Sequence, residues 1–190
     1  MTGNNKPLIL ASQSPRRHSL LSQMGYSFEI CVPDVDEHAE GTPRDIVLTL
    51  ARRKARAVAA QYEHGIIIAS DTLVSIDDEP LGKPVDESDA VSMLQRLSGR
   101  EHEVFTGVCV IDASTGDERA EVARTGVRFA TLTPSDICRY VATGEPMDKA
   151  GAYGIQGEAG RFVLSLDGSY DNVVGFPTDL VAALLANFSM

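Results

Sequence analysis

The apolar residues of the chain fall into short runs, separated by segments whose apolar positions repeat with a helical period. Residues 8–11 and 66–69 are uninterrupted apolar runs, which are typical of strands buried on both faces. Residues 103–111 and 118–129 predict a long antiparallel pair joined across 113–117. The first of the two is apolar on both faces, so we expect it to be a central strand. Shorter strands are expected at 26–33 and 162–166.

Between these strands, apolar residues spaced three and four apart predict helices. The expected helices are 15–24, 44–62, 90–98, 134–143 and 177–187. Helices that alternate with strands, together with one long hairpin, predict an α/β fold with a mixed central sheet and flanking helices. No repeat, low-complexity tract or long linker interrupts the sequence, so we expect residues 1–190 to form a single domain.

The amino-acid composition argues against several classes of protein and of binding partner. The 190 residues carry 27 acidic and 17 basic side chains, a formal charge of −10, which argues against a nucleic-acid partner because duplex binding needs an extended basic surface. Three cysteines without a Cys-x-x-Cys pair argue against a disulfide framework or structural zinc. The first six residues lack the features of a signal peptide, and no apolar run approaches the ~20 residues of a membrane span. We therefore expect a cytoplasmic protein without a membrane partner.

A carboxylate follows the apolar run at 66–69. Because side chains alternate along a strand, Ile67, Ala69 and Asp71 share one face. We expect the strand to end at Asp71, at the edge of the sheet where open α/β folds bind ligands. The alternative is an aspartate that only closes the strand in a turn.

The helix entry at residues 14–17 departs from the pattern of the others. Its first turn holds Arg16 and Arg17, where the helix dipole favours acidic side chains. The entries at residues 42–45, 86–89 and 133–136 each place an aspartate there instead. This contrast indicates that the first entry binds an anion with its backbone N–H groups and two guanidinium groups. Two solvated arginines are the alternative.

Four further features bear on the binding of an anionic ligand. Lys54 falls in the apolar stripe of helix 44–62, so it must extend to solvent or meet an anion, and we favour the anion. Lys83 lies in a tight loop over 80–84, which is not a Walker A loop because its spacing fails on both sides. The acidic loop 34–38 is either a solvated turn or the source of a carboxylate for Mg²⁺. Residues 148–157 are rich in glycine, which would let the backbone approach a ligand closely.

Six stretches, in this order along the chain, together resemble the Maf family of nucleoside triphosphate pyrophosphatases. They are Leu-Ala-Ser-x-Ser-Pro-Arg-Arg at 10–17, Asp-Glu at 36–37, Arg-Lys-Ala at 53–55, Ser-Asp-Thr at 70–72, Gly-Lys-Pro at 82–84 and Tyr-Gly-Ile-Gln-Gly at 153–157. The resemblance continues through residues 168–175 to the last helix. It implies a fold similar to the inosine triphosphate pyrophosphatases, with two lobes around a cleft.

The resemblance also implies an activity and roles for individual residues. The activity is hydrolysis of a nucleoside triphosphate to its monophosphate and pyrophosphate. Asp71 matches the proton acceptor, and whether it orients a water or holds a metal stays open. The remaining matches are Ser12, Arg17, Lys54 and Lys83 for the substrate phosphates, Glu37 with Asp71 for a divalent cation (Mg²⁺ or Mn²⁺), and Arg16, Thr72 and Gln156 for specificity.

The specificity positions separate the family's subgroups. Where this chain has Arg16 and Thr72, the subgroup that acts on 7-methyl-GTP typically has Trp and Gln, so the resemblance implies the dTTP/UTP subgroup. Two alternatives stay open: an enzyme of the same chemistry that prefers purines such as 7-methyl-GTP, and a non-catalytic nucleotide-binding regulator of septum formation. The sequence is compatible with a homodimer without requiring one.

Overall fold

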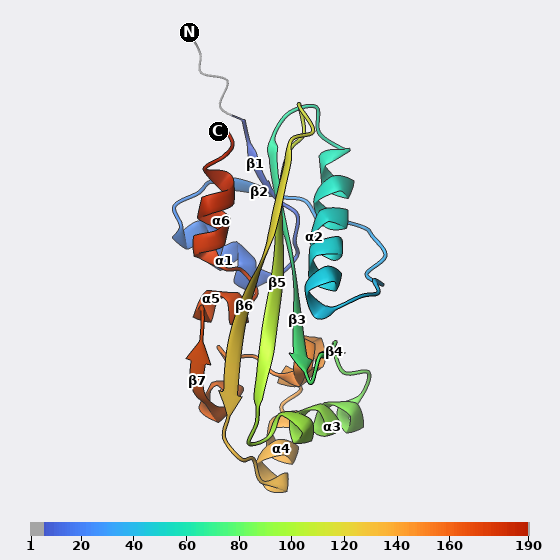
Figure 1. Ribbon diagram of the computed structural model, residues 1–190, viewed down its shortest axis with the longest axis vertical. Helices are drawn as coiled ribbons and strands as arrows, with labels where there is room; N and C mark the ends of the chain where they lie inside the picture. The colour runs from blue at the N-terminus through green and yellow to red at the C-terminus, as the bar shows by residue number, and fades with distance from the viewer. Residues whose placement is uncertain (1–5, 190) are drawn as a thin grey trace.

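The computed structural model describes residues 6–189, so residues 1–5 of the N-terminal segment used in the localisation prediction lie outside the described part. Seven strands of the described residues form one mixed sheet in the order β2-β1-β3-β5-β6-β7, with β4 beside β3 (Figure 1). The strands are β1 (Leu8–Leu10), β2 (Phe28–Ile30), β3 (Ile66–Ile76), β4 (Glu79–Leu81), β5 (Glu101–Asp112), β6 (Glu118–Phe129) and β7 (Val163–Asp167). Strands β1, β2 and β3 are parallel and the other pairs are antiparallel. The predicted α/β fold with a mixed sheet is confirmed, as is the central place of β5.

Helices cover both faces and one end of this sheet. The α-helices are α1 (Pro15–Gln23), α2 (Pro43–Ala59), α3 (Glu87–Leu97), α4 (Pro134–Val141), α5 (Tyr170–Val174) and α6 (Thr178–Leu185), and three 3-10 helices, η1 (Glu145–Asp148), η2 (Ala150–Ala152) and η3 (Glu158–Phe162), precede β7. In Figure 1, α1 and α6 lie on one side of the long strands and α2 on the other, while α3 and α4 lie at the far end. None of the helices in residues 6–189 combines the length and apolar character needed to cross a membrane.

The core is divided in the same way. Alternate residues of β3 point to opposite faces, so Ile66 and Ile68 pack under α1 and α6 while Ile67 and Ala69 pack under α2. A separate core at the far end joins the last residues of β3 to α3 and α4, around side chains such as Phe129. These cores give the molecule two lobes, which share the long strands β3, β5 and β6 (Figure 1).

Strand β3 is longer than the sequence indicated, and the expectation that it ends at Asp71 is wrong. It continues to Ile76 because β5 pairs with it from Ile66 to Ser75, so Asp71 lies in the middle of the strand. Along its other edge, β1 pairs only with residues 66–68 and β4 only with residues 74–76. Within the described residues, the stretch of β3 between them has no partner strand on that edge. Asp71 therefore still lies at an opening in the sheet, between the ends of β1 and β4.

The helix entries follow the sequence rules. Thr42 and Thr133 form capping boxes with the aspartates three residues later, and Asp86 accepts a hydrogen bond from the backbone N–H of Asp89. Helix α1 has Pro15 at its start but no side-chain cap and no acidic residue in its first turn. The contrast that the sequence indicated is thus present in the structure.

Three local expectations differ from the structure. β2 is confined to Phe28–Ile30. The predicted loop at residues 80–84 begins inside β4, which forms a tight hairpin with β3 through Asp77 and Asp78, both with positive φ. The short helix α5 follows the Asp167–Gly168 turn and was not predicted, because five residues are too few to show a helical period.

Candidate active site

A cleft of about 840 Å³ opens at the unpaired edge of β3, between the two lobes. All nine residues singled out in the sequence line it: Ser12, Arg16, Arg17, Glu37, Lys54, Asp71, Thr72, Lys83 and Gln156. The loop after β1 supplies Ser12, the first turn of α1 supplies Arg16 and Arg17, and the loop after β4 supplies Lys83. Because side chains of β3 alternate between the faces, Asp71 and Thr72 enter the cleft from opposite sides of the same strand edge.

Lys54 lies at the centre of the charged part of the cleft. Its side chain is 10% exposed, and Nζ lies 2.7 Å from Asp71 Oδ1 and 2.6 Å from Glu37 Oε1. The hydrogen bond from Lys54 holds the pKa of Glu37 below its ordinary value. Lys54 lies buried on the face of α2 where the sequence placed it, and the anions it contacts in the protein are two carboxylates; its contact with a substrate phosphate stays a prediction.

A glycine brings Lys54 to this place. Gly107 on β5 is the cross-strand partner of Asp71. A Cβ atom at Gly107 would lie 2.4 Å from the carbonyl oxygen of Val47 in α2. Only glycine lets the helix backbone come this close to the sheet, and the close approach carries Lys54 to Asp71.

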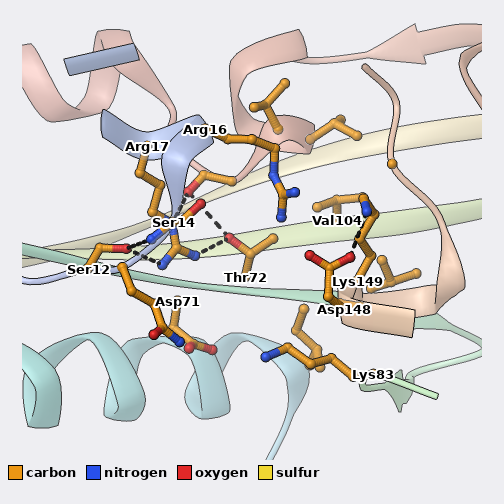
Figure 2. Close-up of a pocket in the computed structure, with 18 of the residues that line it drawn as sticks. Ser12, Ser14, Arg16, Arg17, Asp71, Thr72, Lys83, Val104, Asp148 and Lys149 are labelled. Carbon is orange, nitrogen blue, oxygen red and sulfur yellow. Dashed lines mark hydrogen bonds and ion pairs between the residues drawn. The ribbon is translucent and has the colours of Figure 1, made fainter. Parts of the chain in front are cut away.

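Arg17 is fixed by the protein on three sides. Its Nε donates to the carbonyl of Gly175 at 2.9 Å, its Nη2 to Thr72 Oγ1 at 3.2 Å, and its Nη1 to Ser12 Oγ at 3.4 Å (Figure 2). Burial lowers the pKa of Arg17, although the Asp71 carboxylate acts in the opposite direction. An arginine remains protonated at neutral pH even so, so the cleft holds a permanent, oriented positive charge.

The loop before α1 has the features of an anion site. Ser12 Oγ accepts a hydrogen bond from the backbone N–H of Ser14 at 3.1 Å, and His18 Nε2 lies 2.8 Å from the Ser12 carbonyl oxygen. These two contacts fix the conformation of the turn. The first N–H groups of α1 have no acidic side chain to bind them. Free N–H groups and the positive end of the helix dipole favour a negatively charged group here.

The far lobe forms the opposite wall. Asp148 and Arg16 face each other across the cleft (Figure 2), and the positive charge of Arg16 contributes to a lowered pKa of Asp148, after the larger effect of its hydrogen bond with Lys149. Lys149 Nζ bonds Asp148 Oδ1 and the Glu145 carbonyl, both at 2.6 Å. Gln156 lies exposed on the rim.

The glycines of this wall also lie against side chains of the protein itself. A Cβ at Gly154 would lie 2.7 Å from Lys149 Cε, and one at Gly157 would lie 2.0 Å from Glu145 Oε1. These glycines make room for side chains of the protein itself. The sequence analysis named Asp148, Lys149, Tyr153 and Gly175 only as members of longer stretches and gave none of them a role in the site.

Comparison with known proteins agrees with the geometry. The sequence profile of the family described as Maf-like protein matches residues 7–188. The chain belongs to the Maf family. Relatives named dTTP/UTP pyrophosphatase include those of Desulforamulus reducens, 50% identical over 97% of this chain and 98% of the relative, and of Symbiobacterium thermophilum, 51% identical over 95% and 93%. An archaeal relative of the same name, from Thermococcus gammatolerans, is 49% identical over 92% of both chains.

This membership confirms the family predicted from the sequence motifs. Within the described part of this Maf chain, no group of three or more His, Cys, Asp or Glu side chains forms a complete metal site. Glu37 and Asp71 do converge on one point, the ammonium of Lys54. Two carboxylates fit a hard cation such as Mg²⁺ when phosphate oxygens and water supply the remaining ligands.

Proposed function

We propose that the chain hydrolyses dTTP and UTP to the nucleoside monophosphate and pyrophosphate. The observation that carries the proposal is a cleft that gathers Arg17, Lys54 and Lys83 around Asp71 in a chain of net charge −10. Carboxylates line the same cleft, and two of them, Glu37 and Asp71, pair with Lys54. Arg17 and Lys83 are therefore the basic groups that we propose to meet a ligand with several closely spaced negative charges. The names of relatives about half identical to this chain support dTTP and UTP as the substrates.

The reaction adds one water to the triphosphate and breaks one phosphoanhydride bond. The oxygen of the water joins phosphorus, the bridging oxygen leaves with pyrophosphate, and a proton leaves the attacking water. Phosphoryl transfer needs little covalent help from a protein, so positioning and charge stabilisation supply most of the catalysis. In our proposal the first N–H groups of α1, with Ser12 and Arg17, hold one end of the phosphate chain, and Lys83 holds the other.

Asp71 is the proposed acceptor of the water proton. Its side chain is 14% exposed at the cleft, so a water can approach it, and its Oδ1 is held by Lys54 at 2.7 Å, which leaves Oδ2 for the water. Glu37 and Asp71 are the proposed ligands of a divalent cation, Mg²⁺ or Mn²⁺. When bound, that cation would neutralise phosphate charge and polarise a phosphoryl oxygen.

A pair of Asp→Asn variants tests this proposal. Asp71→Asn keeps the shape of the side chain and removes its charge, and we expect pyrophosphate release from UTP to fall at least ~10²-fold while thermal melting stays close to that of the wild type. Asp77→Asn is the matched control, because Asp77 lies in the turn of the same hairpin, exposed and paired with Arg100. The proposed role of Asp71 is wrong if both variants turn over UTP alike.

The same assay separates an enzyme from a nucleotide-binding regulator. A regulator would bind UTP and release no pyrophosphate in the wild type, and Asp71→Asn would then change nothing but affinity.

A further inference from the structure

A chain of buried polar groups leads from the cleft into the sheet behind it. Arg17 Nη2 donates to Thr72 Oγ1, and Thr72 Oγ1 lies 3.0 Å from the hydroxyl of Thr106 (Figure 2 shows the contact of Arg17 with Thr72). Thr106 is the cross-strand partner of Thr72 and donates in turn to the Asn172 carbonyl at 3.1 Å. Thr106 and Asn172 are completely buried, and the contacts from Thr72 to Thr106 and from Thr106 to Asn172 are direct.

Each threonine hydroxyl has one hydrogen to donate, which limits the directions open to the hydrogen bonds of the chain. The carbonyl of Asn172 accepts from the Gly175 N–H at 3.0 Å and lies 3.1 Å from Thr106 Oγ1. In the arrangement in which Thr106 donates to this carbonyl, Thr106 accepts from Thr72, and Thr72 donates inward while its oxygen accepts from Arg17.

The other internal acceptor that the described residues offer to Thr72 is weaker. The carbonyl of Gly175 lies 3.4 Å from Thr72 Oγ1 and already accepts from Arg17 Nε at 2.9 Å. Whichever of the two acceptors Thr72 uses, its hydrogen points into the protein. The remaining lone pair of the Thr72 oxygen then faces the cleft.

The carbonyl that orients Thr106 is itself held rigidly. The side-chain amide of Asn172 donates to the Val104 carbonyl and to Thr125 Oγ1, each at 3.0 Å, and this ties α5 to β5 and β6. Among the described residues the Oδ1 atom of the same amide is buried without a hydrogen-bond partner, so it is the two donated hydrogen bonds that hold Asn172 in place.

We propose that Thr106 is a positioning residue that makes Thr72 a hydrogen-bond acceptor toward the cleft, so that the site selects bases with a ring N–H. This inference rests on the proposed function, since it explains how the base would be recognised. Uracil and thymine carry N3–H and can donate to Thr72. Cytosine has a bare nitrogen at that position, and two lone pairs would then face each other. The site would thus reject cytidine nucleotides through a residue that never touches them.

Thr106→Val tests the inference, because valine has nearly the shape of threonine and lacks the hydroxyl. Without Thr106 the one internal acceptor left to the Thr72 hydrogen among the described residues is the weaker Gly175 carbonyl at 3.4 Å, so the hydrogen turns toward the ligand more easily and can be donated to cytosine. Calorimetric affinities for UMP and CMP, and kcat/KM for UTP and CTP, measure the effect. We expect the wild type to prefer the uridine compounds and Thr106→Val to reduce the ratio about fivefold to tenfold, the scale of one hydrogen bond.

Two controls separate this effect from a loss of packing. Thr106→Ser restores the hydroxyl and should restore the ratio. Ser75→Ala removes a buried hydroxyl from β3 that has no partner among the described residues, and it should leave the ratio at the wild-type value. Thr106→Ala replaces Thr106→Val in the measurement if the valine variant does not fold.

The outcomes distinguish the inference from the proposed function. An unchanged UMP-to-CMP ratio in the folded Thr106 variant overturns the inference, as does a wild type that binds UMP and CMP equally. If the wild type releases pyrophosphate from UTP and the ratio does not move, the inference alone fails. If the ratio moves as expected and no pyrophosphate is released, the proposed activity fails and the inference stands.

Discussion

Replacing Lys54 by methionine separates the roles of its charge and its hydrocarbon stem. Met fills nearly the same space, so α2 should keep its packing and no cavity should form. What is lost is the ammonium between Asp71 and Glu37, at 2.7 and 2.6 Å. Glu37 is 59% exposed and can be solvated, whereas Asp71 is 14% exposed and is left with an unpaired charge.

The size of the stability loss follows from this burial. Breaking a fully buried pair costs about 3–5 kcal/mol, and breaking an exposed one less than about 1 kcal/mol. Asp71 lies between these limits on the wall of an open cleft, so we expect Lys54→Met to lower the free energy of unfolding by about 1–2 kcal/mol. In the background of Asp71→Asn the same change should cost almost nothing, because no unpaired charge remains. A double-mutant cycle from urea unfolding gives this coupling directly.

Activity is the second readout of the same variant. If Lys54 also stabilises phosphate charge, Lys54→Met should reduce kcat/KM for UTP at least ~10²-fold. Lys83→Met is the matched control: Lys83 is exposed at the cleft, and no ion pair to it occurs among the described residues, so that variant should lose activity without losing stability. A Lys54→Met protein with wild-type stability and wild-type turnover would refute the reasoning.

Two further predictions concern the scaffold. Gly107→Ala should lower the free energy of unfolding by about 1–3 kcal/mol and reduce turnover, because the added Cβ would collide with the Val47 carbonyl and push Lys54 away from Asp71. Gly126→Ala in β6 is the control, because its added Cβ would make only ordinary van der Waals contacts. Neither stability nor turnover should fall in that variant. Burial lowers the pKa of His102 to about 4 from 6.5, so stability should be complete above pH 6.5 and decline as the pH falls toward 4, because the unfolded chain takes up the proton first. Urea unfolding should show a loss of about 2 kcal/mol between pH 7 and pH 5 from this group, and His102→Gln should remove that part of the pH dependence; an equal slope in both proteins would contradict the assignment.

The hydrophobic pattern predicted most of the fold because it reflects directly which residues are buried. It identified the alternation of strands and helices, the central place of β5 and the buried face of α2 that holds Lys54. It placed the end of β3 wrongly, since Ser70, Asp71 and Thr72 interrupt the apolar run while β5 continues to pair with the strand. Strand length there is set by the partner, and one strand's own sequence does not contain that information.

The sequence predicted which residues line the site better than it predicted the hydrogen bonds between them. The unusual arginines at the α1 entry and the lysine on an apolar stripe are local violations of simple rules, and such violations often mark functional positions. The contact of Arg17 with Gly175 joins residues 158 positions apart, and the chain from Thr72 through Thr106 to Asn172 joins three elements. No local rule is broken by Thr106 or Gly175, so nothing in the sequence pattern marked them.

The central claim is that the chain releases pyrophosphate from pyrimidine nucleoside triphosphates. Its most direct test is to incubate the wild type with dTTP, UTP, CTP, GTP and 7-methyl-GTP at one Mg²⁺ concentration and to measure monophosphate and pyrophosphate together. We expect equal amounts of the two products, with the highest kcat/KM for dTTP and UTP and a low value for CTP. A preference for either guanine nucleotide, release of orthophosphate with a diphosphate, or no turnover at all would contradict it.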